Sequence, residues 1–174
     1  YVTDIERIQQ NYRRINQAFD QAEVMYAAKA NTGSEVIKAI YEEDAVMECA
    51  AATEVQRVLD AGVSPEDIQY TAMNPPAKDL DYIVNLWEEE PSLTVTAGAI
   101  DTLDRLAERG FNGEILLRVN PGIGTGHHDK VAMGKDTKFG IPENRILQAV
   151  EKAREEFNFR GIHAHVGSGI LNDE

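Results

Sequence analysis

A regular alternation between short apolar runs and longer amphipathic stretches constrains the fold of this chain more than any other feature. The apolar runs have the length of single strands, and the stretches between them repeat apolar residues every three or four positions, as helices do. Parallel strands need a crossover that is usually a helix, so the alternation predicts βαβ units and a parallel sheet. The expected strands are residues 24–28, 45–49, 68–71, 93–96, 115–119 and 161–166, and the expected helices are residues 5–19, 34–41, 53–61, 77–87, 100–109 and 142–157.

Two parallel architectures fit this order of elements: an open doubly wound sheet and a closed eight-stranded barrel. No glycine-rich dinucleotide turn follows the first expected strand, which disfavours the doubly wound sheet. A closed barrel needs eight strands and about 250 residues, whereas this chain has 174 residues and six expected strands. If the fold is a barrel, residues 1–174 form a single, incomplete barrel domain. Both faces of its strands are expected to be apolar, and Gly62, Gly110 and Gly161 are expected to end helices.

Both architectures place their chemistry at the carboxyl ends of the strands. Potentially reactive side chains follow or end several expected strands, namely Lys29, Glu48, Arg118, His163, His165 and Ser168. The sequence therefore predicts a functional site at this rim of the sheet.

Lys29 ends an apolar run just before a turn. A lysine that is desolvated beside other cations becomes a nucleophilic amine, and such amines form Schiff bases with carbonyls, including that of pyridoxal phosphate (PLP). A lysine at a strand end can also simply extend to water along its aliphatic stem. The residue by itself leaves both interpretations open.

The stretch "HAHVGSG", residues 163–169, combines two histidines with a glycine-serine-glycine turn. Alternation along a strand puts His163 and His165 on the same face, where an imidazole can stack on an aromatic ligand or move protons. The following backbone N–H groups and the Ser168 hydroxyl can donate to a phosphate. A structural histidine pair is an alternative. A zinc site that also uses His127 and His128 is disfavoured because no carboxylate completes a ligand spacing.

Two further segments lie at the same predicted rim. A glycine-rich loop of residues 118–140 separates the fifth strand from its helix, and long loops at an active face often act as lids. A merely flexible insertion is the alternative. Glu48 is expected to face the same rim as Lys29, whereas Glu54 in the first turn of a helix is expected to stabilise the helix macrodipole.

Charge and composition exclude several classes of protein. The formal net charge is −13, which disfavours nucleic acid as a partner, and no apolar run is long enough for a membrane span. The N-terminus lacks the pattern of a signal peptide, and Cys49 is the only cysteine, which fits a reducing cytoplasm. The acidic excess indicates either an ordinary charged surface or adaptation to high salt.

Several stretches together resemble the barrel domain of the PLP-dependent decarboxylases that act on ornithine, arginine and diaminopimelate. They occur in order and cover nearly the whole chain: "YAAKAN", "ECAAATEVQRVLDAG", "YTAMNPPAKDL", "LLRVNPGIGTGHH", "KFGIP" and "GIHAHVGSGI". The pair "RVNPGIGTGHH" and "KFG" is more similar to the diaminopimelate branch than to the ornithine branch. The acidic, arginine-favouring composition resembles members from halophilic archaea.

The resemblance implies a role for particular residues. Lys29 matches the lysine that forms the Schiff base with PLP, and Glu48 matches an acidic position near that bond. His165 matches the histidine that stacks on the pyridine ring, Ser168 a serine at the cofactor phosphate, and Arg118 an arginine near the ring oxygen. The loop before residue 138 matches the mobile loop that closes over substrate. No metal is implied.

The resemblance also implies an architecture and an activity. The fold would be α/β, a partial TIM-like (β/α)8 barrel of the PLP fold-type III class with six parallel strands present. A C-terminal β-domain and other cofactor contacts would lie outside these residues, so this piece alone is expected to be inactive. The full-length enzyme would be a cytoplasmic homodimer that decarboxylates meso-2,6-diaminopimelate to L-lysine and CO2, the last step of lysine biosynthesis.

Some positions depart from the family pattern. Residues 50–52 are all alanine where the family often has a serine, and Gly98-Ala99 replaces a frequent Asp-Ser. These departures concern substrate positioning more than PLP chemistry. Another fold-type III enzyme, such as an ornithine- or arginine-type decarboxylase or an alanine racemase, and a non-catalytic PLP-binding relative are the alternatives.

Overall fold

The computed structural model describes residues 2–19, 21–122, 125–126, 139–165 and 167–168. Its main sheet is parallel, with the order β1-β2-β3-β4-β5 and β8 paired to the far side of β5. Its strands are β1 (Tyr26–Ala27), β2 (Met47–Cys49), β3 (Ile68–Ala72), β4 (Thr94–Ala97), β5 (Glu114–Asn120) and β8 (Asn158–Ala164). The short β7 (Ile141–Pro142) pairs with the end of β5, and β6 (Thr125–Gly126) pairs with β9 (Gly167–Ser168).

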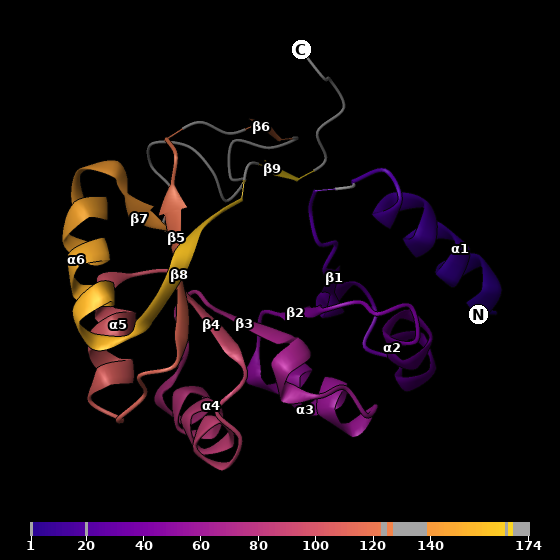
Figure 1. The fold of residues 1–174 in the computed structure, drawn as a ribbon, viewed down its shortest axis with the longest axis horizontal. Helices are drawn as coiled ribbons and strands as arrows, with labels where there is room; N and C mark the ends of the chain where they lie inside the picture. Colours follow the sequence, from indigo (N-terminus) through magenta and orange to yellow (C-terminus); the bar gives the residue numbers. More distant parts are fainter. Residues whose placement is uncertain (1, 20, 123–124, 127–138, 166, 169–174) are drawn as a thin grey trace.

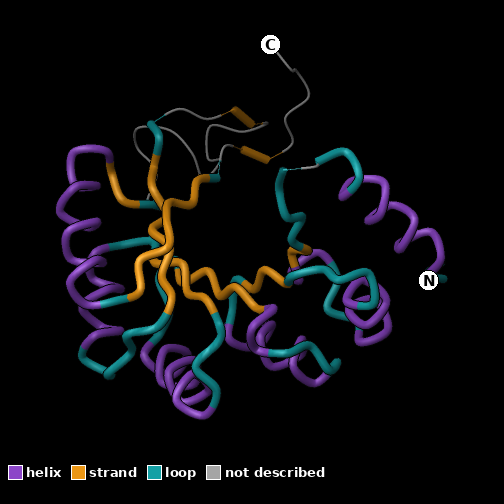
Figure 2. The backbone as a smooth tube through the Cα atoms, in the orientation of Figure 1, coloured by secondary structure: helices purple, strands orange, loops and turns teal. Residues whose placement is uncertain are grey.

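Helices follow the strands and lie along the outside of the sheet, which curves into an open arc (Figures 1 and 2). The α-helices are α1 (Ile5–Asn16), α2 (Ser34–Tyr41), α3 (Ala52–Asp60), α4 (Ala77–Glu89), α5 (Ile100–Ala107) and α6 (Ile146–Glu156). Short 3-10 turns cover Ala28–Ala30, Pro65–Asp67 and Glu143–Arg145. The predicted partial barrel with parallel strands is therefore confirmed.

The two faces of the sheet differ sharply in character. The strand registers align apolar side chains on the outer face, where the helices bury them: Met47, Cys49, Ile68, Tyr70, Val95, Ala97, Ile115 and Leu117. The alternate positions form the concave face and are largely polar: Glu48, Gln69, Thr71, Thr94, Thr96, Arg118 and His163. The expectation of strands that are apolar on both faces is wrong, because only the outer face packs against helices.

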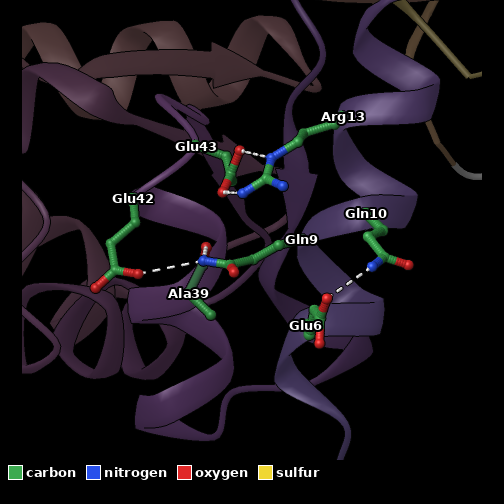
Figure 3. A network of polar contacts seen from close by, with 7 residues as sticks. All are labelled: Glu6, Gln9, Gln10, Arg13, Ala39, Glu42 and Glu43. Carbon is green, nitrogen blue, oxygen red and sulfur yellow. Dashed lines mark hydrogen bonds and ion pairs between the residues drawn. The ribbon is translucent and has the colours of Figure 1, made fainter.

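The N-terminal helix α1 packs beside α2 through polar contacts (Figure 3). Asp4 caps α1, since its carboxylate accepts a hydrogen bond from the Arg7 backbone N–H at 2.9 Å, as expected for a residue of this type before a helix. Arg13 makes a bidentate contact with Glu43, and Gln9 donates to the Ala39 carbonyl at 3.0 Å. These contacts place α1 at the outer edge of the arc.

Several element boundaries differ from the sequence expectation. The first strand is only Tyr26–Ala27, because the chain turns into a 3-10 helix at Ala28. The last strand begins at Asn158, so Gly161 lies inside β8 beside a register shift and does not end a helix. Gly62 and Gly110 do follow helix ends with φ of 96° and 83°, a conformation that glycine adopts without strain.

The arc is open among the described residues. Within the described ranges, β1 pairs only with β2, and β8 pairs only with β5. Ile162 on the outer side of β8 is 57% exposed, whereas the matching outer positions of the other strands are covered. Among the described residues, none of the helices combines enough length and apolar character to cross a membrane.

We expect the packing of α5 on the outer face to carry much of the stability of the chain. Leu103 in α5 has no exposed surface, whereas Leu147 in α6 is 79% exposed. Leu103→Ala should lower the free energy of unfolding by about 2–5 kcal/mol because it leaves a cavity, and Leu147→Ala should change it by less than about 0.5 kcal/mol. Urea unfolding curves of the two variants provide the measurement. Equal effects would contradict the assignment of α5 to the core.

Candidate active site

The parallel strand pairing brings the carboxyl ends of β1 to β5 and β8 to one rim of the arc. Lys29, Glu48, Arg118, His163 and His165 all belong to this end of the molecule. The sequence prediction of a shared rim therefore matches the observed topology.

Lys29 lies on a short turn directly after β1. The turn is a 3-10 helix over Ala28–Ala30. The Tyr26 hydroxyl donates to the Asn31 carbonyl at 3.0 Å, and the Asn31 side-chain oxygen accepts from the Gly33 N–H at 2.9 Å. Lys29 is exposed, as in the second of the two interpretations that the sequence left open. These contacts of Tyr26, Asn31 and Gly33 stabilise the turn that carries Lys29, and the exposed residue is accessible to a ligand.

Glu48, Arg118 and His163 lie on the concave face, and Arg118 and His163 are on neighbouring strands. Glu48 is the central residue of β2, and its side chain is half-buried. Arg118 of β5 is the register partner of His163 of β8, so their side chains lie next to each other on the same face. Non-local strand pairing thus brings together an acid, a guanidinium and an imidazole from separate parts of the sequence.

The charges of these residues act on one another. Burial lowers the pKa of His163 and of His165 below the ordinary histidine value, and the nearby Arg118 lowers both pKa values further. Lys29 adds to the lowering for both histidines, whereas Glu48 opposes it. Burial also lowers the pKa of Arg118, and Glu48 opposes that shift. Both imidazoles are therefore neutral near pH 7 in a site that carries two cations and one carboxylate.

The remaining predicted residues lie at the end of β8 and beyond it. His165 directly follows β8 and is half-buried. Ser168 belongs to β9, whose backbone pairs with β6, so Gly167 and Ser168 lie beside Thr125 and Gly126 of the glycine-rich loop. The predicted lid residues 127–138, including His127 and His128, lie outside the described residues.

The end of the glycine-rich loop packs against the base of the site. The Phe139 ring lies 6.0 Å from the Arg118 guanidinium carbon, within the range of a cation–π contact. Gly140 has φ of 83°, and a Cβ atom there would lie 2.9 Å from the backbone nitrogen of Asn120. Only glycine fits this approach, which accounts for the "FG" pair at the end of the loop.

Sequence reasoning missed the polar lining of the concave face below the rim. Thr71 and Thr96 are register partners on β3 and β4, and both hydroxyls are buried without a hydrogen-bond partner among the described residues. Gln69 is also buried on this face. The alternation Gln69-x-Thr71 beside Thr94-x-Thr96 was the available signal. Glu54, in contrast, accepts from the Ala50 N–H at 2.8 Å, as expected for a residue that stabilises a helix start.

An open parallel (β/α) barrel with a lysine, an arginine and two histidines at its carboxyl rim has the architecture of the barrel enzymes, whose active sites lie at that rim. Within that class, the chain belongs to the pyridoxal-dependent decarboxylases, since residues 5–174 match the model of their pyridoxal-binding domain. The resemblance noted from the sequence motifs is thereby confirmed at the level of the family.

Relatives with known names support the same family. The chain is 35% identical, over its whole length, to a protein named diaminopimelate decarboxylase from Methanothermobacter thermautotrophicus, of which it covers 41%. It is 31% identical over 84% of its length to the Escherichia coli protein of that name, of which it covers 35%. The chain therefore spans less than half the length of these relatives.

Solved structures show the same fold. The diaminopimelate decarboxylase from Helicobacter pylori in complex with L-lysine superposes with a TM-score of 0.85 at 24% identity, over 97% of this chain and 44% of that chain. A second diaminopimelate decarboxylase structure superposes with a TM-score of 0.81 at 29% identity, over 94% of this chain and 39% of that chain.

We expect the histidine titrations to report the influence of Arg118. In the cofactor-free protein, His163 and His165 should titrate below pH 6.5 or so, because burial and Arg118 lower both pKa values. Since the folded-state pKa values are lowered, the associated stability is present above about pH 6.5 and is lost as the pH falls through the folded-state values. Arg118→Gln should raise both midpoints without restoring the ordinary value, because burial remains.

NMR titration of the histidine ring protons provides the measurement for this prediction. Arg145→Gln is the matched control, since Arg145 is exposed on the 3-10 turn before α6 and should leave both midpoints unchanged. Midpoints that do not respond to Arg118→Gln would show that the guanidinium does not face the histidines.

Proposed function

We propose that the full-length protein is a PLP-dependent amino-acid decarboxylase that converts meso-2,6-diaminopimelate to L-lysine and CO2, the last step of lysine biosynthesis. The observation that carries the proposal is the position of Lys29 on its turn, with its amine at the rim that Arg118 and the two histidines share. Family membership over residues 5–174 supports the cofactor. The shared name of the relatives supports the substrate.

The residues present fit PLP, which is an aromatic aldehyde with a phosphate and a phenolic oxygen. Lys29 offers an accessible primary amine for the aldehyde carbon. Arg118 offers a cation for an anionic oxygen. The His163 Nδ1 and the hydroxyls of Thr71 and Thr96 are buried without a partner among the described residues, so the concave face is built to receive polar groups and not to pack against an apolar one.

Each residue has a proposed task. When bound, PLP supplies a carbonyl for the substrate amine and a ring that accepts the electrons left by CO2. Lys29 would hold the cofactor through its Nζ atom. His165, neutral near pH 7, would contact the ring, and Ser168 would help to hold the phosphate. The Glu48 carboxylate would partly balance the positive charges of Arg118 and Lys29.

The domain organisation and setting are part of the proposal. In the part of the chain that the structure describes, β1 and β8 are each unpaired on one side. Further strands of the same protein would close the barrel there, and a C-terminal β-domain would supply the remaining cofactor contacts. Residues 1–174 alone would then lack decarboxylase activity. We further propose a homodimer, as the resemblance implies, and a cytoplasmic setting, which fits a chain whose single cysteine, Cys49, is free and buried.

Replacement of Lys29 tests the cofactor link. The full-length protein incubated with PLP should show a visible absorbance band, and borohydride reduction should leave the cofactor covalently attached at Lys29. Lys29→Ala should abolish both the band and the attachment because no amine remains at that atom. Lys38→Ala, at an exposed position of α2, is the control and should retain both. A band and attachment that persist in Lys29→Ala would refute the assignment.

A substrate panel tests the reaction. The full-length protein should form L-lysine and CO2 from meso-2,6-diaminopimelate and should turn over neither ornithine nor arginine at a comparable rate. Release of CO2 and chromatography of the products provide the measurement. Preferred turnover of ornithine or arginine would move the protein to another branch of the family. Cofactor binding without any turnover would identify a non-catalytic relative.

A further inference from the structure

We propose that His163 is a cofactor-binding residue, whose Nε2–H donates a hydrogen bond to the phenolic oxygen of the bound PLP ring beside the Arg118 guanidinium. The inference rests on the proposed function, since it concerns the same cofactor. It adds a second, uncharged donor to a site for which the sequence motifs indicated only Arg118 at that oxygen.

The strand register places His163 beside Arg118 on the concave face. His163 and Arg118 are register partners on neighbouring parallel strands, β8 and β5, so their side chains leave the concave face side by side. Outward-facing Ile162 and Ala164 are exposed on the opposite side of β8, whereas His163 is half-buried. The imidazole therefore faces the interior of the arc and lies next to the guanidinium.

The environment of the His163 Nδ1 indicates which ring nitrogen carries the proton. Nδ1 of His163 is buried and has no hydrogen-bond partner among the described residues. A proton on Nδ1 would leave a buried donor unpaired, and buried orphan donors are rarer in proteins than under-satisfied acceptors. An imidazolium would add a second cation next to Arg118. The neutral ring with its proton on Nε2 avoids both penalties.

The phenolic oxygen of PLP matches the donors that His163 and Arg118 offer. A neutral N–H beside a guanidinium forms a pair of donors that suits a single anionic oxygen. A phosphate or a second carboxylate would call for further cations, whereas the phenolic oxygen of PLP carries one negative charge and lies on the ring edge. The pair would hold that oxygen ionised without adding a further positive charge to the site.

The test compares two ligands and two side chains in the full-length protein. Asparagine and glutamine both carry an amide, but only the glutamine amide reaches the position of the imidazole Nε2. His163→Asn should weaken PLP binding about ten- to a hundredfold, as expected for loss of a hydrogen bond to a charged group. His163→Gln should bind within about threefold of the natural protein. The PLP analogue without the phenolic oxygen should bind all three proteins with similar affinity.

Titrations that follow the cofactor absorbance band give the affinities, and thermal unfolding of each cofactor-free variant shows whether it folds. Equal weakening of PLP and of the analogue in His163→Asn would overturn the proposal, as would a His163→Gln protein that is as weak as His163→Asn. Absence of any absorbance band in the natural protein would instead refute the proposed function itself.

A second readout does not depend on variants. The 15N resonance of the His163 Nε2 in the natural protein should shift when PLP binds and should remain in place when the analogue without the phenolic oxygen binds. The same shift with both ligands would show that His163 does not contact that oxygen.

Discussion

Burial of one strand face against a layer of helices is the constraint on which the rest of this structure depends. The outer face of the sheet is apolar in every central strand and is covered by α3 to α6. Burial of such side chains contributes about 25 cal/mol per Å², so this layer fixes the register of each strand. A slip by one residue would expose the apolar set. The opposite, concave face does not pack against helices. It can therefore carry polar and charged side chains, namely Glu48, Gln69, Arg118 and His163.

Much of this arrangement follows from local sequence patterns. The order of strands and helices is predictable because each element has its own periodicity, and parallel pairing then dictates a shared rim. What lay beyond prediction depends on non-local contacts. Lys29 belongs to a 3-10 turn held by Tyr26 and Asn31, and Gly161 accommodates a register shift against β5. Neither can be read from the periodicity of its own segment.

The candidate site, like the fold, was predictable from sequence only in part. The residue types were identifiable from motifs, but their mutual influence was not, because it depends on which strands pair. Arg118 and His163 are far apart in sequence and become neighbours only through the pairing of β5 with β8. Burial and, after it, the proximity of Arg118 lower the pKa of His163 and keep its ring neutral near pH 7. The concave threonines were overlooked because a threonine in a strand is ordinary until its hydroxyl is found buried without a partner.

The chain as a whole is strongly acidic, whereas the site carries more cations than carboxylates. The formal net charge is −13, which on average repels an anionic cofactor or substrate. Charges are screened over about 8 Å at physiological ionic strength, so most of the surface carboxylates act weakly on a ligand inside the arc. Lys29 and Arg118 act at short range, and Arg118 lies in a partly desolvated place where screening is weaker. The acidic surface can therefore vary widely among related proteins, while the local balance of two cations, one carboxylate and two neutral imidazoles decides what the site binds.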